Sequence, residues 1–277
     1  MKITYLGTAA AEGIPALFCK CEYCNGVRSR GGKEIRSRSQ VLIDGELSID
    51  FPPDAFYHAA AFGVDFSELK YLLVTHTHMD HFYAHDFVLH GHVYAHGLRA
   101  PLDIFGNEEV RAVFHECTRR ELHSAVKETI RLHTLTPFEE VAFGGYRVFP
   151  LKANHTSESP LVYLIEKDGK RVLHLSDTGR LPEEDYEYLS QVGGKIDLIT
   201  FECTYLWNEA GPSARHMGVK EIAEALKRLA RLGLADENTK KVLTHFSHNA
   251  KPEPAALAKA EKELGAVAAY DGMEITI

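Results

Sequence analysis

The sequence lacks long hydrophobic runs and any excess of positive charge. No window of about 18 consecutive apolar residues occurs in the chain, so we expect no membrane-spanning segment. Among its 277 residues, 31 Lys and Arg stand against 39 Asp and Glu, and the formal net charge is −8. That balance argues against wholesale electrostatic capture of nucleic acid or of an anionic membrane. We therefore expect neither as a partner.

Cysteine is scarce as well. Five are present, an odd number, and Met1 to Gly7 have the pattern of a strand and not that of a signal sequence. Both observations argue against a disulfide framework and make the cytoplasm the expected location. Three of the cysteines, Cys19, Cys21 and Cys24, lie close together, which favours metal ligation.

The chain also lacks internal repeats, low-complexity tracts and a recognisable linker, so we expect one domain over residues 1–277. Strand-like runs alternate with helix-like ones, and Asp-Gly pairs at 44–45 and 168–169 predict tight turns between strands. Hairpins interleaved with helices predict two sheets with helices outside them. The helices are expected over 219–232, where the apolar periodicity is clearest, and near 53–62, 107–121, 182–191 and 252–264.

The strongest motif is His76-Thr77-His78-Met79-Asp80-His81, which directly follows an apolar strand at 71–75. Side chains at the end of a strand can converge on one point while the strand holds them in place. His76 and His78 can face one ion, and Asp80 and His81 then point to a second ion beside it. Imidazole and carboxylate ligands suit zinc, manganese or iron.

This H-x-H-x-D-H run resembles the signature of the metallo-β-lactamase superfamily, and the resemblance extends over nearly the whole chain. That superfamily adds an aspartate after an early strand, then a histidine, an aspartate and a last histidine, each after a strand. The matching residues are Asp50, His155, Asp177 and His245. The resemblance implies an α/β fold, a four-layer αββα sandwich of two mixed sheets with outer helices.

The resemblance also implies how the ligands of two catalytic divalent ions divide. One ion would be held by three histidines, the other by two histidines and an aspartate, with a further aspartate bridging them. These sets are His76, His78 and His155; Asp80, His81 and His245; and the bridging Asp177. Asp50 would orient a ligand imidazole from behind.

Cys19, Cys21 and Cys24 form a C-x-C-x-x-C run, and three thiolates suit zinc or an iron–sulfur cluster. A closed structural zinc site needs a fourth ligand, for which His248 is the candidate. Free thiols or a redox pair are the alternatives. With this loop the chain resembles the PhnP-type cyclic phosphodiesterases, which also carry T-H-x-H-M-D-H, T-H-x-S-H and a terminal D-G-M-E turn, here Asp271 to Glu274. That resemblance implies a homodimer.

Two metal ions about 3.5–4 Å apart can bind a bridging hydroxide and clamp an in-line displacement at phosphorus. We therefore predict a metal-dependent phosphoric diester hydrolase acting on a small phosphodiester; the resemblance implies a ribosyl 1,2-cyclic phosphate. Asp80 and His216 are the predicted catalytic residues, His216 as a general acid or a phosphate contact. Arg215 is a weaker candidate for pairing with phosphate.

Two other activities stay open on the same core. A tRNase Z- or RNase J-like nuclease would need a basic module, and only the stretch from Arg28 to Arg38 offers one, as a phosphate-attracting rim or simply as a solvated loop. The other is a thioester or lactone hydrolase, or a PqqB-like protein, which the cysteine loop also resembles. The histidines of residues 85–96, with Arg99, are expected to be structural or to line a pocket.

Overall fold

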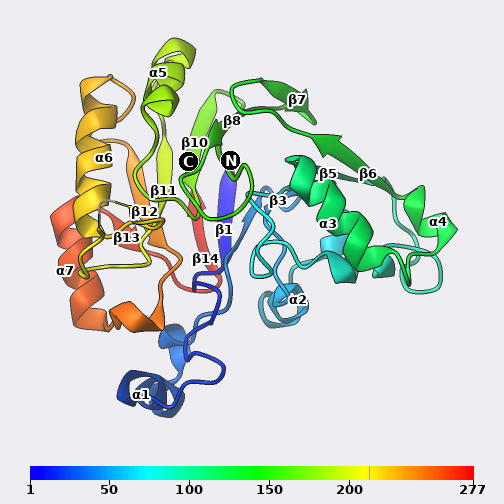
Figure 1. Ribbon diagram of the computed structural model, residues 1–277, viewed down its shortest axis with the longest axis horizontal. Helices are drawn as coiled ribbons and strands as arrows, with labels where there is room; N and C mark the ends of the chain where they lie inside the picture. The colour runs from blue at the N-terminus through cyan, green and yellow to red at the C-terminus, as the bar shows by residue number, and fades with distance from the viewer. Residues whose placement is uncertain (212) are drawn as a thin grey trace.

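The structure is a computed structural model that describes residues 1–211 and 213–277. It contains two seven-stranded sheets, which lie side by side in Figure 1 with helices on their outer sides. In the first sheet the order is β14 (Met273–Thr276), β1 (Lys2–Gly7), β2 (Gln40–Ile43), β3 (Leu47–Ile49), β4 (Tyr71–Leu73), β5 (Leu102–Gly106) and β6 (Ile130–Thr134). In the second it is β13 (Val267–Ala268), β12 (Lys240–Thr244), β11 (Leu198–Glu202), β10 (Lys170–Leu175), β9 (Leu161–Lys167), β8 (Tyr146–Lys152) and β7 (Val141–Phe143).

The helices form two outer layers. Beside the second sheet lie α5 (Glu183–Val192), α6 (Val219–Arg231) and α7 (Pro254–Leu264), and beside the first lie α2 (Ala55–Phe62), α3 (Glu108–Thr118) and α4 (Ser124–Lys127) (Figure 1). Helix α1 (Glu22–Arg30) stands apart from both layers at the lower end of the view. No helix in the described part of the chain is both long and apolar enough to cross a membrane.

Three apolar clusters hold the layers together, and strand periodicity explains why there are three. Successive side chains on a strand point to opposite faces, so each sheet can bury both. On β2, Val41 and Ile43 join the cluster between the two sheets, whereas Leu42 packs with the helices outside. On β10, Val172 points inward and Leu173 toward α5 to α7. The structure is thus the four-layer αββα sandwich expected from the sequence.

The element boundaries also agree with the sequence for the long helices, because the five expected ones occur within about three residues of their predicted ends. The Asp44-Gly45 turn forms as predicted, with φ of 52° and 76° at the two residues. The prediction for the stretch from Arg28 to Arg38 was right only in part. Arg28, Arg30 and Lys33 are exposed, as expected of a solvated segment, but the first residues of the stretch end α1 and Arg36 is buried.

Candidate metal centre

The predicted ligands gather at one edge of the sandwich because the strands that precede them run in the same direction. β3 and β4 are parallel in the first sheet, and β10, β11 and β12 are parallel in the second. Their carboxyl ends therefore meet at that edge. The ligands follow those ends directly: Asp50 follows β3, the His76–His81 motif follows β4, His155 follows β8, Asp177 follows β10 and His245 follows β12.

The first group brings together three histidines and Asp177. His78 Nδ1 lies 3.1 Å from His76 Nε2 and 3.1 Å from His155 Nε2. Oδ2 of Asp177 lies 3.8 Å from His76 Nε2 and 3.5 Å from His155 Nε2. These four atoms converge on one point, as predicted for the first ion.

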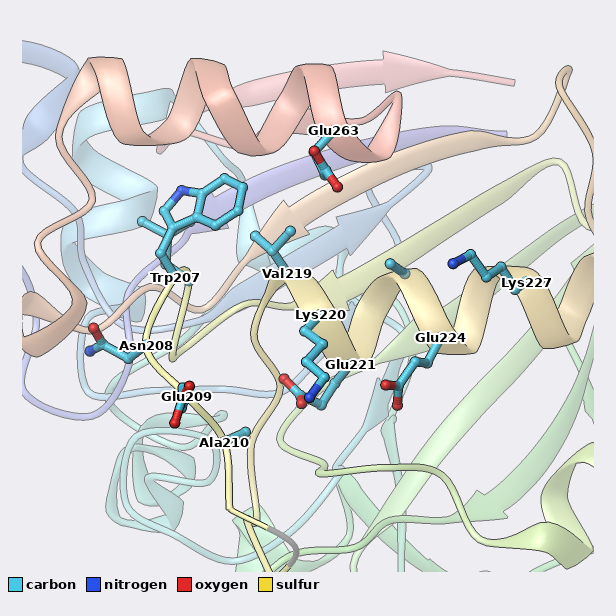
Figure 2. Close-up of a pocket in the computed structure, with 12 residues that line it drawn as sticks. Trp207, Asn208, Glu209, Ala210, Val219, Lys220, Glu221, Glu224, Lys227 and Glu263 are labelled. Atoms are coloured by element: carbon cyan, nitrogen blue, oxygen red, sulfur yellow. The ribbon is translucent and has the colours of Figure 1, made fainter.

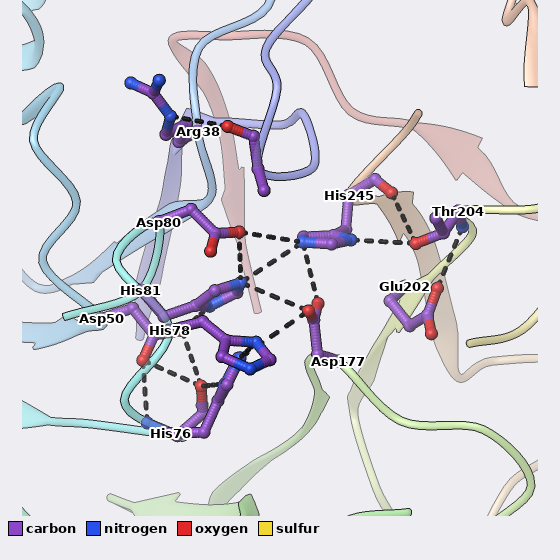
Figure 3. Close-up of polar contacts among 12 residues, drawn as sticks. Arg38, Asp50, His76, His78, Asp80, His81, Asp177, Glu202, Thr204 and His245 are labelled. Carbon is purple, nitrogen blue, oxygen red and sulfur yellow. Dashed lines mark hydrogen bonds and ion pairs between the residues drawn. The ribbon is translucent and has the colours of Figure 1, made fainter. Parts of the chain in front are cut away.

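The second group adjoins the first and shares Asp177 with it (Figure 3). His81 Nε2 lies 3.3 Å from His245 Nε2, 3.1 Å from Asp80 Oδ2 and 3.5 Å from Asp177 Oδ2. His245 Nε2 lies 2.8 Å from the other Asp177 oxygen, Oδ1, which is buried and makes no hydrogen bond among the described residues. Asp177 is therefore placed to serve both groups.

These separations fit a metal centre better than a hydrogen-bonded cluster. Zinc–nitrogen bonds of about 2.0–2.1 Å in tetrahedral geometry set two ligand atoms about 3.3–3.4 Å apart. The nitrogen–nitrogen distances of 3.1–3.3 Å lie close to that value. An ion held between the rings would also satisfy the buried Asp177 Oδ1.

The electrostatics of the second group favour a cation. Burial opposes ionisation of Asp177, but the His245 and His81 imidazoles bring the pKa of that carboxyl well below its usual range. Burial lowers the pKa of His245, yet Asp177 and Asp80 raise it to about 10. The two carboxylates thus attract positive charge to the point where the ring nitrogens meet.

Each ligand imidazole except that of His78 is held from behind through its other ring nitrogen. This is the arrangement that fixes the tautomer and the orientation of a metal-binding histidine. The contacts are His81 Nδ1 to Asp50 Oδ2 at 2.7 Å, His245 Nδ1 to Thr204 Oγ1 at 2.9 Å, His76 Nδ1 to Thr75 Oγ1 at 3.0 Å and His155 Nδ1 to the Arg215 carbonyl at 3.2 Å. Asp50 was predicted in this position from the sequence, and the two threonines were not.

His216 reaches the same site, where it is held by a glutamate that was not predicted from the sequence. Its Nδ1 lies 3.1 Å from Oε1 of the fully buried Glu202, the last residue of β11. Burial lowers the pKa of His216, but Glu202 raises it above the ordinary value. Glu202 also accepts hydrogen bonds from the backbone N–H groups of Thr204 and Met217. It therefore ties the loop after β11 to the segment that carries His216.

A cavity of about 230 Å³ opens over the clustered ligands. Besides His78, Asp80, His155, Asp177 and His245, its lining includes His216, Thr204, Thr156 and Glu12, and no Lys or Arg is among the described lining residues. A larger hollow of about 480 Å³ lies between the loop after β11 and helices α6 and α7 (Figure 2). Within the described ranges no group of metal-ligating side chains occurs there, so the smaller cavity is the candidate site.

The second predicted metal site is also assembled. Cys19, Cys21, Cys24 and His248 place their ligand atoms within 4.8 Å of one another. His248 Nδ1 lies 3.4 Å from Cys24 Sγ and 4.0 Å from Cys21 Sγ, where a tetrahedral zinc site sets sulfur and nitrogen about 3.6 Å apart. Hydrogen bonds from the Cys24 backbone, His248 and Cys19 lower the pKa of the Cys21 thiol to about 6. These residues fit a structural zinc.

The side chains of the remaining candidates do not contact the clustered ligands. His90 bonds to Thr129, and His92 stacks on His123 with ring centroids 3.7 Å apart. Arg99 lies 3.8 Å from Glu68, and the Arg215 side chain binds Asn154. These side chains serve local structure, as expected for the histidines.

Basic side chains between Arg28 and Arg38 likewise pair with other residues of the chain. Arg36 donates to Thr8 Oγ1 at 2.8 Å and lies 4.7 Å from the Phe246 ring centroid. Arg30 pairs with Glu34 at 2.7 Å, and Arg38 pairs with Asp54 at 3.0 Å. No phosphate-attracting rim results.

Comparison with known proteins agrees with this geometry. The family model described as Beta-lactamase superfamily domain matches residues 40–246, so the chain belongs to that superfamily. No curated protein sequence matches the chain. The fold and the paired His/Asp groups define a metal-dependent hydrolase of the metallo-β-lactamase superfamily, as the sequence motif predicted.

Three solved structures illustrate the range of proteins that share the fold. Zn²⁺-bound PqqB from Methylobacterium extorquens has a TM-score of 0.77 at 17% identity, with 100% of both chains covered. A diphosphatase from the PhnP family has a TM-score of 0.73 at 20% identity, covering 100% of this chain and 97% of that one. The short form of human tRNase Z has a TM-score of 0.69 at 18% identity, covering 100% and 99%. At such identities the likeness concerns the fold.

Proposed function

We propose that this protein is a dinuclear metal-dependent phosphodiesterase that acts on a small phosphodiester. The observation that carries the proposal is the pair of ligand groups that share Asp177, with His216 on the wall of the same cavity. Zinc, manganese and iron all suit these ligands. The similarity to a PhnP-family diphosphatase supports chemistry at phosphorus.

The protein's own groups divide the work. Two divalent ions held there would lower the pKa of a water molecule and stabilise negative charge on phosphoryl oxygens. Asp177 would fix the spacing of the two ligand groups. The ionised Asp80 would help His81 and His245 to hold the second ion. Glu202 accepts a hydrogen bond from Nδ1 of His216, which leaves Nε2 to contact a phosphoryl oxygen or to donate a proton to the leaving alkoxide.

The cavity supports a small substrate over a long nucleic acid. Phosphate backbones are bound chiefly by Lys and Arg, and the described lining residues include neither. Glu12 on the wall adds a negative charge that a second phosphate would meet. Activity on RNA, as expected for a nuclease with this core, is therefore the weaker hypothesis.

The test combines metal analysis with a substrate panel. The purified protein would be assayed for bound Zn, Mn and Fe, then for turnover of a ribosyl cyclic phosphate, a linear phosphodiester, a dinucleoside diphosphate, a long RNA, a thioester and a lactone. We expect turnover of small diesters only. Turnover confined to the thioester or the lactone, or none by protein loaded with two ions, would contradict the proposal.

A further inference from the structure

A continuous series of buried polar contacts connects the C-terminal D-G-M-E turn with the metal centre. Asp271 Oδ2 accepts the backbone N–H of Ser37 at 2.6 Å, and the Ser37 hydroxyl lies 2.7 Å from His58 Nε2. The other ring nitrogen of His58, Nδ1, lies 2.6 Å from Gln40 Oε1. The series crosses from the C-terminal turn through α2 to strand β2, and the proposed mechanism uses none of these side chains.

The orientation of the Gln40 amide follows from its partners. Its Nε2 lies 3.3 Å from the carbonyl oxygen of Asp50 and 3.1 Å from Ser48 Oγ. A carbonyl oxygen can only accept, so the NH₂ group must face Asp50 and Oε1 must face His58. His58 Nδ1 therefore carries a proton and donates it to Gln40. Ser48 Oγ donates a second bond to the same Asp50 carbonyl at 2.8 Å.

The Asp50 carbonyl matters because of its backbone conformation. Asp50 has φ of 63°, in the left-handed region that residues other than glycine seldom occupy and that persists only where surrounding contacts enforce it. The same residue receives hydrogen bonds on its carboxylate from the Thr75 N–H at 2.8 Å and from His81 Nδ1 at 2.7 Å. A rotation of the Asp50 backbone would move the carboxylate and the imidazole it holds.

These side chains are shielded from water, which makes their hydrogen bonds consequential. His58 is 0% exposed and Gln40 is 1% exposed. Burial lowers the pKa of His58 to about 4, so the ring is neutral and acts by hydrogen bonding. A buried polar group that loses its hydrogen-bond partner destabilises the fold more than an exposed one does. If one contact of the series were removed, we therefore expect the Asp50 backbone at its end to move.

We propose that Gln40 and His58 are positioning residues of the metal centre: through the Asp50 carbonyl they hold the left-handed backbone that directs the Asp50 carboxylate at His81. The inference rests on the proposed function, since it requires that His81 bind an ion. It concerns the group formed by Asp80, His81 and His245. It makes the C-terminal turn a distant support of that group.

The test measures ion affinity as well as turnover. Gln40→Leu removes all three contacts of the amide, with His58, Asp50 and Ser48, whereas Gln40→Glu keeps an acceptor for His58 and removes the donor to Asp50 and Ser48. Both variants should weaken the second ion on the order of tenfold, as loss of an outer partner typically does, in competition with a chromophoric chelator for Zn²⁺ or Mn²⁺. The ion held by His76, His78 and His155 should be affected less. His58→Phe should act in the same direction.

Thr200→Val is the matched control. It removes a buried hydroxyl whose oxygen lies 2.7 Å from the Tyr5 hydroxyl and which takes no part in the series. It should lower stability and leave both ion affinities unchanged. Ser48→Ala, a milder change to the same Asp50 carbonyl, keeps the test decisive should Gln40→Leu fail to fold. Unchanged second-ion affinity in Gln40→Glu and Ser48→Ala would overturn the inference. A wild-type protein that binds no pair of ions would instead refute the proposed function, and this inference with it.

Discussion

At the scale of single residues, Oδ2 of Asp177 is the atom that joins the two halves of the site. It lies 3.8 Å from His76 Nε2 and 3.5 Å from His81 Nε2, which belong to different groups. No other described carboxylate belongs to both groups. The two-ion character of the site therefore depends on this side chain more than on any single histidine.

Asp177→Ala should reduce turnover of a small diester by at least about a hundredfold, because it removes the carboxylate placed between both groups. The protein should stay folded, since Asp177 lies beyond the end of β10. Rates, bound metal per chain and circular dichroism check this. Asp168→Asn, on an exposed turn, is the control. Substantial turnover by the Ala variant, or by Asp80→Ala, would refute the two-ion mechanism.

His216 and Glu202 should act as one unit. Glu202→Gln weakens the acceptor of the His216 Nδ1–H and should lower kcat by about 10- to 100-fold, with a smaller effect on bound metal, because Glu202 is hydrogen-bonded to the ligand His245 only through Thr204. His216→Ala should lower it by at least as much. The double variant should be no worse than His216→Ala alone, since residues that act together are not additive. Additive losses would show that the two side chains act separately.

The site residues that could be predicted from the sequence are those that directly follow a buried strand. Asp50 and His245 directly follow buried strands, so their location could be inferred from the sequence. Thr75 and Thr204 could not, because a hydroxyl behind an imidazole leaves no pattern and depends on contacts between distant segments. Glu202 was within reach, since it too is an acidic residue that ends a buried strand.

At the scale of elements, the sequence predicted strands and helices with strong periodicity and missed those without it. Strand β6 has one buried side chain in five and lies at a sheet edge, so its pattern is weak. Helix α1 contains Gly26 and buries only three side chains, and its start is marked by Cys21, whose sulfur accepts the Cys24 N–H. The C-x-x-C spacing that suggested a metal site is also a helix cap.

The cysteine loop should stabilise the molecule separately from catalysis. Cys21→Ser should remove one zinc per chain and lower the unfolding midpoint, because a structural metal contributes its binding free energy to folding. The catalytic ions should remain, since Cys21 is not among their clustered side chains. Cys117→Ser, a thiol outside both sites, is the control. Unchanged zinc content in Cys21→Ser would remove the structural-zinc assignment.

At the scale of the whole molecule, the interleaved hairpins and helices predicted two sheets with outer helices, and the resemblance carried by the His76–His81 motif implied the four-layer order that the structure has. The substrate could not be predicted, because it depends on loops from both sheets that meet only in the folded chain. The fold thus determines where the metal site lies, while a few side chains that line the cavity determine which substrate it accepts.

One buried carboxyl, that of Asp185 in the first turn of α5, should contribute to the pH dependence of the free energy of unfolding. Its side chain is 0% exposed, Oδ1 accepts the Lys152 N–H at 3.1 Å and Oδ2 has no partner among the described residues. Burial raises the pKa of Asp185 to about 7 from 3.8. The folded state therefore holds a proton that the unfolded state loses, so stability falls as pH rises from about 4 to 7 and levels off above.

Asp185→Asn keeps the acceptor for Lys152 and cannot ionise, so it should remove this dependence. Relative to the wild type, its free energy of unfolding should be higher at pH 8 by on the order of 2–4 kcal/mol, with a smaller difference at pH 5. Urea unfolding of both proteins at the two pH values measures this. Comparison at equal pH cancels effects of the metal ligands, and Asp168→Asn should show no such difference. An equal gap at both pH values would mean that Asp185 is already ionised in the folded protein at pH 5.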